Sequence, residues 1–282
     1  MAAHDPIARR LAEYTPASPE EEQGALKEIL QEVALLGLSN AGFFEEAAFH
    51  GGTSLRIVHD LPRFSEDLDF ALHAPNPEFA WAPYAKALDT TFAAFGIRPE
   101  FKDRHRAGKA VQSMWLKDNS LGTLLDLSFV HLPGKKLRIK LEVDTRPPMG
   151  AMTMRRFVNF PVEYPVEVWD LPSNFAGKLH ANLCRAHVKG RDWFDFNWYL
   201  RLGVAPNLTL LSRAIDQQGP WVGQGIEATM DWLKDALVRK IESIDWTSAA
   251  ADVEPFLKGA ELDALAHWEA ELFLQNTERL QS

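Results

Sequence analysis

Residues 49–70 read FHGGTSLRIVHDLPRFSEDLDF and contain the most informative pattern of this chain. Gly51 and Gly52 follow an apolar residue and precede a run with helical spacing, which predicts the end of a strand, a tight turn and then a helix. From residue 67 to residue 72 apolar side chains alternate with Asp67, Asp69 and Ala71, which is the period of a strand with one buried face. The segment therefore predicts two strands joined by a glycine turn and a helix.

Asp67 and Asp69 share one face of the second strand, about 6.6 to 7 Å apart along the chain. Two carboxylates on one face repel each other, so the arrangement is costly unless a cation lies there or water screens both. Residues 139–144 predict another strand, whose polar face carries Lys140, Glu142 and Asp144. A third carboxylate from that strand would complete a site for Mg²⁺, which prefers carboxylate oxygen. Glu142 and Asp144 both fit, with Glu142 preferred for its central place, and a charged outer face fits as well.

The turn at residues 51–54 lets the backbone approach a ligand closely at the start of a helix, where free amides and the helix dipole favour a phosphate. Thr53 or Ser54 would cap the same helix if the turn binds nothing. The turn lacks the lysine of a Walker loop and the three glycines of a dinucleotide-binding fingerprint. On its own it is weak support for nucleotide binding.

Together, residues 51–55 (GGTSL) and 63–70 (RFSEDLDF) resemble the AbiEii/AbiGii toxin family of nucleotidyltransferases, within the polymerase β-like nucleotidyltransferase superfamily. That family combines a Gly-Gly-Thr turn with an Arg-(apolar)-Ser-Glu-Asp-(apolar)-Asp-(apolar) strand. The resemblance runs from about residue 49 to residue 195. It implies transfer of a nucleoside monophosphate from a nucleoside triphosphate (NTP), with Mg²⁺ as cofactor, expected as two ions.

A later motif of the family, a Lys, an Arg and then Asp-x-x-Asp, matches Lys178, Arg185, Asp192 and Asp195. The spacing of Lys178, Arg185 and Lys189 predicts three cations on one helical face, which could hold a triphosphate or be solvated.

The resemblance also implies a role for individual residues. The implied metal ligands are Asp67, Asp69 and Glu142. The implied catalytic residues are Asp67, Asp69, Glu142, Lys178 and Asp192, the last organising the acceptor side. The implied nucleotide-binding residues are Gly51, Gly52, Thr53, Ser65, Lys178 and Arg185. The acceptor implied is RNA, with the 3′ end of tRNA expected, and the partner implied is a cognate antitoxin protein in a toxin–antitoxin, phage-defence pair.

Patterns along the chain predict an α+β fold followed by a helical bundle. The expected division is an N-terminal helical segment at 1–40, a nucleotidyltransferase domain with a mixed β-sheet and flanking helices at 41–170, and a C-terminal helical domain at 171–282. The expected helices are 20–36, 41–48, 79–95, 174–187, 192–202, 208–216, 226–240 and 262–280. The strands expected after 68–72 are 110–116, 121–130 and 137–143, with a hairpin turn at Gly134.

The chain of 282 residues has a net charge of −9, but the charge is uneven. Residues 102–156 contain 12 basic and 5 acidic residues, with Phe101, Trp115 and Phe129 nearby. This composition suits a phosphate backbone, and equally the solvated faces of a β-hairpin region. The single cysteine, Cys184, excludes a disulfide framework, and no long apolar run or leader is found. A cytoplasmic protein without membrane contact is expected.

Two other functions fit the same residues. One is a module with this fold that binds a nucleotide or a protein without catalysis, and the other is a transferase that modifies a protein or small-molecule hydroxyl. The complete set of Asp67, Asp69, Glu142 and Lys178 argues against a degenerate binding module. The nine histidines match no zinc motif, and the serines match no nucleophile elbow.

Overall fold

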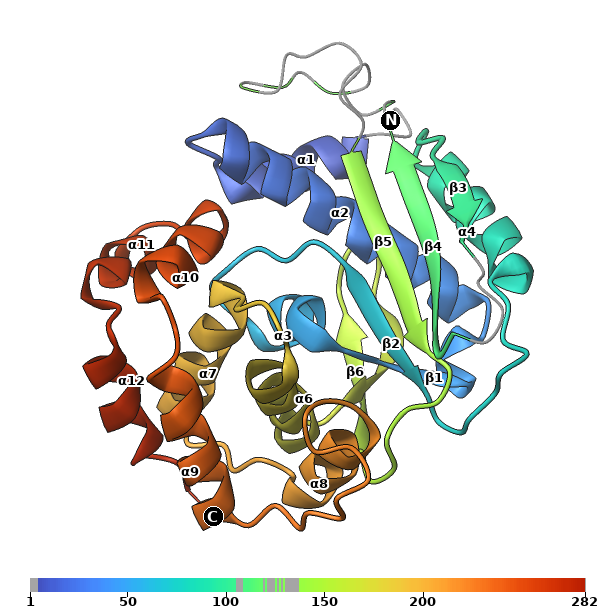
Figure 1. Cartoon of the computed structure of the whole chain (residues 1–282). Helices are drawn as coiled ribbons and strands as arrows, with labels where there is room; N and C mark the ends of the chain where they lie inside the picture. Colours follow the sequence, from blue (N-terminus) through green and yellow to red (C-terminus); the bar gives the residue numbers. More distant parts are fainter. Residues whose placement is uncertain are drawn as a thin grey trace. The chain divides into compact units, whose positions relative to one another are not determined.

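The computed structural model describes residues 5–104, 109–118, 120, 125, 127, 129 and 137–281 (Figure 1). The chain divides into two compact units. Unit 1 comprises the ranges 1–60, 64–147 and 154–168, and unit 2 comprises 61–63, 148–153 and 169–282. The chain thus leaves unit 1 after Asp60, contributes three residues to unit 2 and re-enters unit 1 at Phe64.

Unit 1 is built on a mixed β-sheet, which confirms the expected α+β fold. Among the described residues the sheet has seven strands in the order β3-β4-β5-β2-β1-β7-β6. The strands are β1 Ala47–His50, β2 Leu68–Leu72, β3 Glu100–Asp103, β4 Val111–Asp118, β5 Leu137–Asp144, β6 Thr153–Val158 and β7 Tyr164–Trp169. β2 is antiparallel to β1 and parallel to β5, and β1 is parallel to β7. β2 is therefore an inner strand of the sheet, and Asp69 does not lie on an edge strand.

The helices of unit 1 include α2, which packs against one face of β5. They are α1 Asp5–Tyr14, α2 Pro19–Asn40, α3 Gly51–His59 and α4 Ala82–Ala94, with a short 3-10 turn, η1, at Phe43–Glu45. The helix expected at 20–36 is confirmed as α2, whose N-cap Ser18 accepts a hydrogen bond from the Glu21 amide at 3.2 Å. α2 packs against α1, α4 and β5, and the alternate β5 residues Ile139, Leu141 and Val143 are fully buried. The intervening β5 residues, which carry the charges, lie on the opposite face.

The helix expected at 41–48 is wrong. Gly42 has a φ of +73°, η1 follows for three residues only, and β1 begins at Ala47. Residues 47–49 are buried between β2 and β7, and this burial favours an inner strand over a surface helix. The strands β6 and β7 were not expected from the sequence.

The remaining expected elements of unit 1 lie close to the observed ones. The helix expected at 79–95 is α4, which begins at Ala82, and the strands expected at 110–116 and 137–143 are β4 and β5. The strand expected at 121–130 lies largely outside the described residues, and the turn expected at Gly134 lies wholly outside them.

Unit 2 is helical, as expected for the C-terminal part. Its helices are α6 Leu171–Cys184, α7 Gly190–Leu202, α8 Leu208–Gln217, α9 Met230–Ile241, α10 Trp246–Val253, α11 Ala260–Asp263 and α12 Ala270–Thr277, with 3-10 turns η2 Glu254–Phe256 and η3 Ala264–His267. The single helix expected at 262–280 is wrong, because the backbone is extended at Trp268 and Glu269. The Trp268 ring packs edge-on against Phe273 and Trp246, so burial of this aromatic cluster accompanies the break. No described helix is long and apolar enough to cross a membrane.

Candidate active site

Gly51 joins β1 directly to α3, at a position that requires a residue without a side chain. Its φ of +79° lies in the left-handed region, and a Cβ at this position would lie 2.7 Å from Oδ2 of Asp69. The predicted strand, turn and helix are confirmed here. The same close approach places the N-terminus of α3 beside the carboxylate of Asp69.

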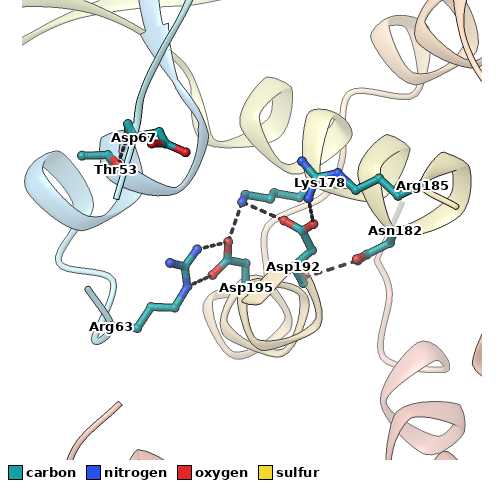
Figure 2. A network of polar contacts seen from close by, with 8 residues as sticks. All are labelled: Thr53, Arg63, Asp67, Lys178, Asn182, Arg185, Asp192 and Asp195. Atoms are coloured by element: carbon teal, nitrogen blue, oxygen red, sulfur yellow. Dashed lines mark hydrogen bonds and ion pairs between the residues drawn. The ribbon is translucent and has the colours of Figure 1, made fainter. Parts of the chain in front are cut away.

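The side chains after the glycine pair do not cap α3. The N-cap residue is His50, which makes no side-chain capping hydrogen bond. The buried Thr53 instead donates a hydrogen bond through Oγ1 to the carbonyl oxygen of Asp67 (Figure 2). Ser54 Oγ is buried without a hydrogen-bond partner in the described part of the chain. The capping alternative for residues 53 and 54 is therefore wrong, and Thr53 ties the helix to the residue that precedes β2.

Asp67 and Asp69 lie on the same side of the sheet as Glu142. Register pairs Asp69 with Glu142 on β5, and Asp67 lies two residues before Asp69. Burial, together with the negative charges of Asp69, Glu66 and Glu142, raises the pKa of Asp67 to about 6. The structure therefore concentrates negative charge around Asp67, and a cation would relieve it.

The register distinguishes the two candidates for the third carboxylate. Glu142 lies directly opposite Asp69, whereas Asp144 lies opposite Ala71, two residue pairs further along the same two strands. Asp144 Oδ1 accepts a hydrogen bond from the amide of Arg146 at 2.9 Å. The strand pairing thus favours Glu142 as the companion of Asp69.

The side chain of Glu142 is engaged on its own side of β5. Its Oε1 lies 2.7 Å from Nζ of Lys140 and accepts a hydrogen bond from Ser113 Oγ at 3.2 Å. Within the described residues, no group of three or more His, Cys, Asp and Glu side chains stands close enough together to hold a metal ion. Asp67, Asp69 and Glu142 fit Mg²⁺ in donor type and strand placement, but Glu142 would have to exchange Lys140 for the ion.

Ser65 lies in the loop before β2, and its backbone is held by α2. Its carbonyl oxygen accepts a hydrogen bond from Gln31 Nε2 at 3.1 Å, and its neighbour Glu66 forms an ion pair with Lys27 at 2.8 Å. Both partners lie on α2, so this helix fixes the loop that leads to Asp67.

Unit 2 contains a compact network of cations and carboxylates (Figure 2). Nζ of Lys178, on α6, lies 3.1 Å from Oδ1 of Asp192 and 2.8 Å from Oδ2 of Asp195, both on α7. Arg185 binds the other oxygen of Asp192 through Nη1. Arg63 donates to both oxygens of Asp195, from Nε at 2.7 Å and from Nη2 at 2.6 Å. Lys178 and Arg185 are thus brought together by Asp192.

The burial of this network increases towards Asp195. The side chain of Asp195 is 0% exposed and that of Arg63 is 2% exposed, whereas Arg185 is 44% exposed. Burial alone would raise the pKa of Asp195, but the charges of Arg63 and Lys178 hold it below its usual value. Asp195 therefore contacts two cations, Arg63 and Lys178, which favour its charged form.

The continuous cationic stripe expected over Lys178, Arg185 and Lys189 is wrong. α6 ends at Cys184, Arg185 is its C-cap, and Lys189 is the N-cap of α7. The chain turns between the two helices, and this turn returns Asp192 to Lys178.

The sequence motifs contain Arg63 and Asp195, but the sequence analysis predicts no role for either residue. The signal that could have indicated a buried ion pair is the carboxylate of Asp195 among the aromatic residues of 193–199.

Part of the basic stretch expected at 102–156 lies on the sheet. Lys102, Arg138 and Lys140 lie on β3 and β5, whereas Arg106, Lys135 and Lys136 lie outside the described residues.

Known families and structures resemble this chain over most of its length. The profile of the family described as "Nucleotidyl transferase AbiEii toxin, Type IV TA system" matches residues 33–272. The chain belongs to this AbiEii family. The resemblance seen in the sequence is therefore confirmed, and the protein is a nucleotidyltransferase of a toxin family. None of the curated proteins matches the chain.

Two solved structures share the fold of this AbiEii-family chain. MenT4, a nucleotidyltransferase toxin from Mycobacterium tuberculosis H37Rv, is 18% identical with a TM-score of 0.52, over 95% of this chain and 97% of that one. JHP933 from Helicobacter pylori is 17% identical with a TM-score of 0.50, over 92% of this chain and 94% of that one. At such identities the likeness concerns the fold alone.

Proposed function

We propose that this AbiEii-family nucleotidyltransferase transfers a nucleoside monophosphate from a Mg²⁺-bound NTP to RNA, and that its acceptor is the 3′ end of tRNA. The observation that carries the proposal is the pairing of Asp69 with Glu142 beside Asp67 and the N-terminus of α3. A carboxylate group and a helix N-terminus at one place on a sheet suit a metal-bound triphosphate.

Asp67, Asp69 and Glu142 are the proposed ligands of Mg²⁺, expected as two ions. When bound, Mg²⁺ would lower the pKa of the acceptor hydroxyl and neutralise charge on the pyrophosphate leaving group. The proposed work of the chain itself is alignment, since phosphoryl transfer needs positioning and charge compensation more than covalent chemistry.

The remaining roles concern the triphosphate and the acceptor. The amides at Gly51, Gly52 and Thr53 are proposed to hold phosphate oxygens, because a glycine turn at a helix start exposes donors without steric hindrance. Ser65 is proposed as a further phosphate contact. Lys178 and Arg185 are proposed to bind the triphosphate by charge, with Asp192 keeping both cations in place and organising the acceptor side.

The choice of RNA is supported by cations on β3, β4 and β5, whose sheet face continues to Glu142. The choice of tRNA follows the family resemblance. With tRNA as the substrate, the proposed site of action is the cytoplasm. We also propose that a cognate antitoxin inhibits the enzyme there. The type IV toxin–antitoxin description of the family supports that partner.

The test is a labelling experiment with purified protein, Mg²⁺, each radiolabelled NTP in turn and total bacterial RNA. We expect a labelled tRNA band that disappears in an Asp67→Asn, Asp69→Asn variant with an unchanged circular dichroism spectrum. Label on protein or on a small molecule would show that the acceptor hydroxyl belongs to that molecule and not to RNA. Nucleotide binding with no labelled product would leave the binding module as the better description.

A further inference from the structure

The sheet face that carries Glu142 continues across β5, β4 and β3 as a band of cations around one aromatic ring. Register places Trp115 of β4 between Lys102 of β3 and Lys140 of β5. The Trp115 ring is half-buried, and Nζ of Lys140 lies 5.9 Å from its centroid. The flanking β4 residues Met114 and Leu116 are buried, so the strand alternation turns Trp115 to the face opposite the core.

The next row of the same face adds two more cations. Lys117 lies between Glu100 of β3 and Arg138 of β5, and Arg138 is exposed. Desolvation and the nearby charges of Lys102, Arg138 and Arg104 lower the pKa of Lys117. Because Glu100 is the one carboxylate among these three paired residues, the row keeps a net positive charge, and an anion would stabilise it.

The cationic band lies next to the proposed catalytic carboxylates on a continuous sheet. Lys140 lies two residues before Glu142 on β5, and only β5 separates β4 from β2. Two strand spacings of about 4.8 Å place Trp115 about 10 Å from the strand of Asp69. A ligand that extends along this face thus reaches the site of transfer.

We propose that this face, the acceptor face, binds a single-stranded segment of the RNA acceptor, with a base stacked on Trp115 and phosphates held by the surrounding cations. The acceptor face comprises Lys102, Arg104, Trp115, Lys117, Arg138 and Lys140. The proposal rests on the proposed function, since it deepens the description of its acceptor. A single strand is favoured over a duplex because only unpaired bases offer a free π-face to an indole ring, while cations alone would serve any phosphate backbone.

The experiment measures RNA binding by the full-length protein without NTP. The probes are a fluorescein-labelled single-stranded RNA of about 12 nucleotides and a hairpin duplex of equal length, followed by anisotropy over a salt series. We expect Trp115→Ala to weaken single-strand binding about tenfold or more, and Trp115→Phe to keep most of the affinity. We expect Lys102→Gln, Arg138→Gln to reduce the slope of log affinity against log salt by about 1.4, the value for two phosphate contacts to a single strand.

The matched control is Arg155→Gln, Arg156→Gln, which removes the same charge from exposed positions on β6, the edge strand at the other end of the sheet. This control is expected to leave the salt slope close to wild type, and equal melting temperatures would exclude unfolding as a cause.

The proposal is overturned if Trp115→Ala binds the single strand as wild type does, if the β6 control lowers the slope equally, or if the duplex binds as tightly. It is also overturned if Trp115→Ala raises KM for the NTP while RNA binding is unchanged, because the ring then serves the nucleotide. If the RNA-binding results are as expected but no NTP yields a labelled product, the acceptor face stands and the proposed function fails.

Discussion

Arg63 and Asp195, 132 residues apart in the chain, form an ion pair with two hydrogen bonds in the interior of unit 2. Both side chains are almost fully buried, and the second oxygen of Asp195 also binds Lys178 at 2.8 Å. Asp195 therefore shares its charge between a buried arginine and a cation that we propose binds the triphosphate. The two functions of this carboxylate, stability and placement of Lys178, are experimentally separable.

Arg63→Met is expected to lower the free energy of unfolding by about 3 to 5 kcal/mol, because it leaves Asp195 buried with one cation only. Asp195 then holds Lys178, its remaining cation, more strongly. Because Lys178 is less available to the triphosphate, KM for the NTP rises as well. Urea denaturation and steady-state kinetics measure the two effects.

The control for this change is Arg10→Met, which breaks the pair of Arg10 with Glu32 at 2.8 Å between α1 and α2. Arg10 is 29% exposed, so its loss costs less, and KM for the NTP stays at the wild-type value. Equal destabilisation and equal KM in the two variants would contradict the role assigned to Arg63.

Gly51→Ala is expected to abolish transfer and to destabilise the protein. The new Cβ would lie 2.7 Å from Oδ2 of Asp69, and the φ of +79° adds strain for any residue with a side chain. Gly223→Ala is the matched control, because Gly223 has a φ of +70° and no described atom lies within 4 Å of the place that its Cβ would take. The control should lose about 1 kcal/mol and keep its activity. An active Gly51→Ala protein would remove the turn from the proposed site.

Glu142→Gln and Asp144→Asn distinguish the third carboxylate. The register with Asp69 predicts that Glu142→Gln lowers kcat at least about a hundredfold, a loss of several kcal/mol of charge stabilisation. Asp144→Asn is expected to stay near wild type, since its strand partner is Ala71. Titration of activity against Mg²⁺ checks both variants, and the opposite ranking would assign the site to Asp144.

The sequence predicted what depends on local periodicity and could not predict what depends on distant partners. The alternation at 67–72 and 139–144 placed Asp69 and Glu142 on polar faces, and strand pairing then brought these faces together. The helical spacing of Lys178 and Lys189 failed because α6 ends at Cys184, where tertiary pairing with Asp192 accompanies a turn. The strand end before the glycine turn was predicted, but the helix expected at 41–48 was wrong. The alanine-rich segment at 47–48 favours a helix, whereas burial between two strands makes it part of β1.

Glu32, on α2, should make the stability of unit 1 depend on pH. Burial, with a smaller contribution from the charge of Glu28, raises the pKa of Glu32 from 4.5 to about 7, and Arg10 opposes this rise without cancelling it. Because the folded pKa lies above the unfolded one, the folded state binds the extra proton. The stabilisation is complete below about pH 4.5 and is lost as the pH rises through 7, in total about 3 kcal/mol.

Glu32→Gln should therefore unfold with a smaller loss of free energy between pH 5 and pH 8 than wild type does, because the amide carries no proton to lose. Glu13→Gln, which removes the exposed partner of the same Arg10, should keep the wild-type pH dependence. Urea denaturation at the two pH values decides, and parallel losses in wild type and Glu32→Gln would show that Glu32 is charged in the folded protein throughout this range.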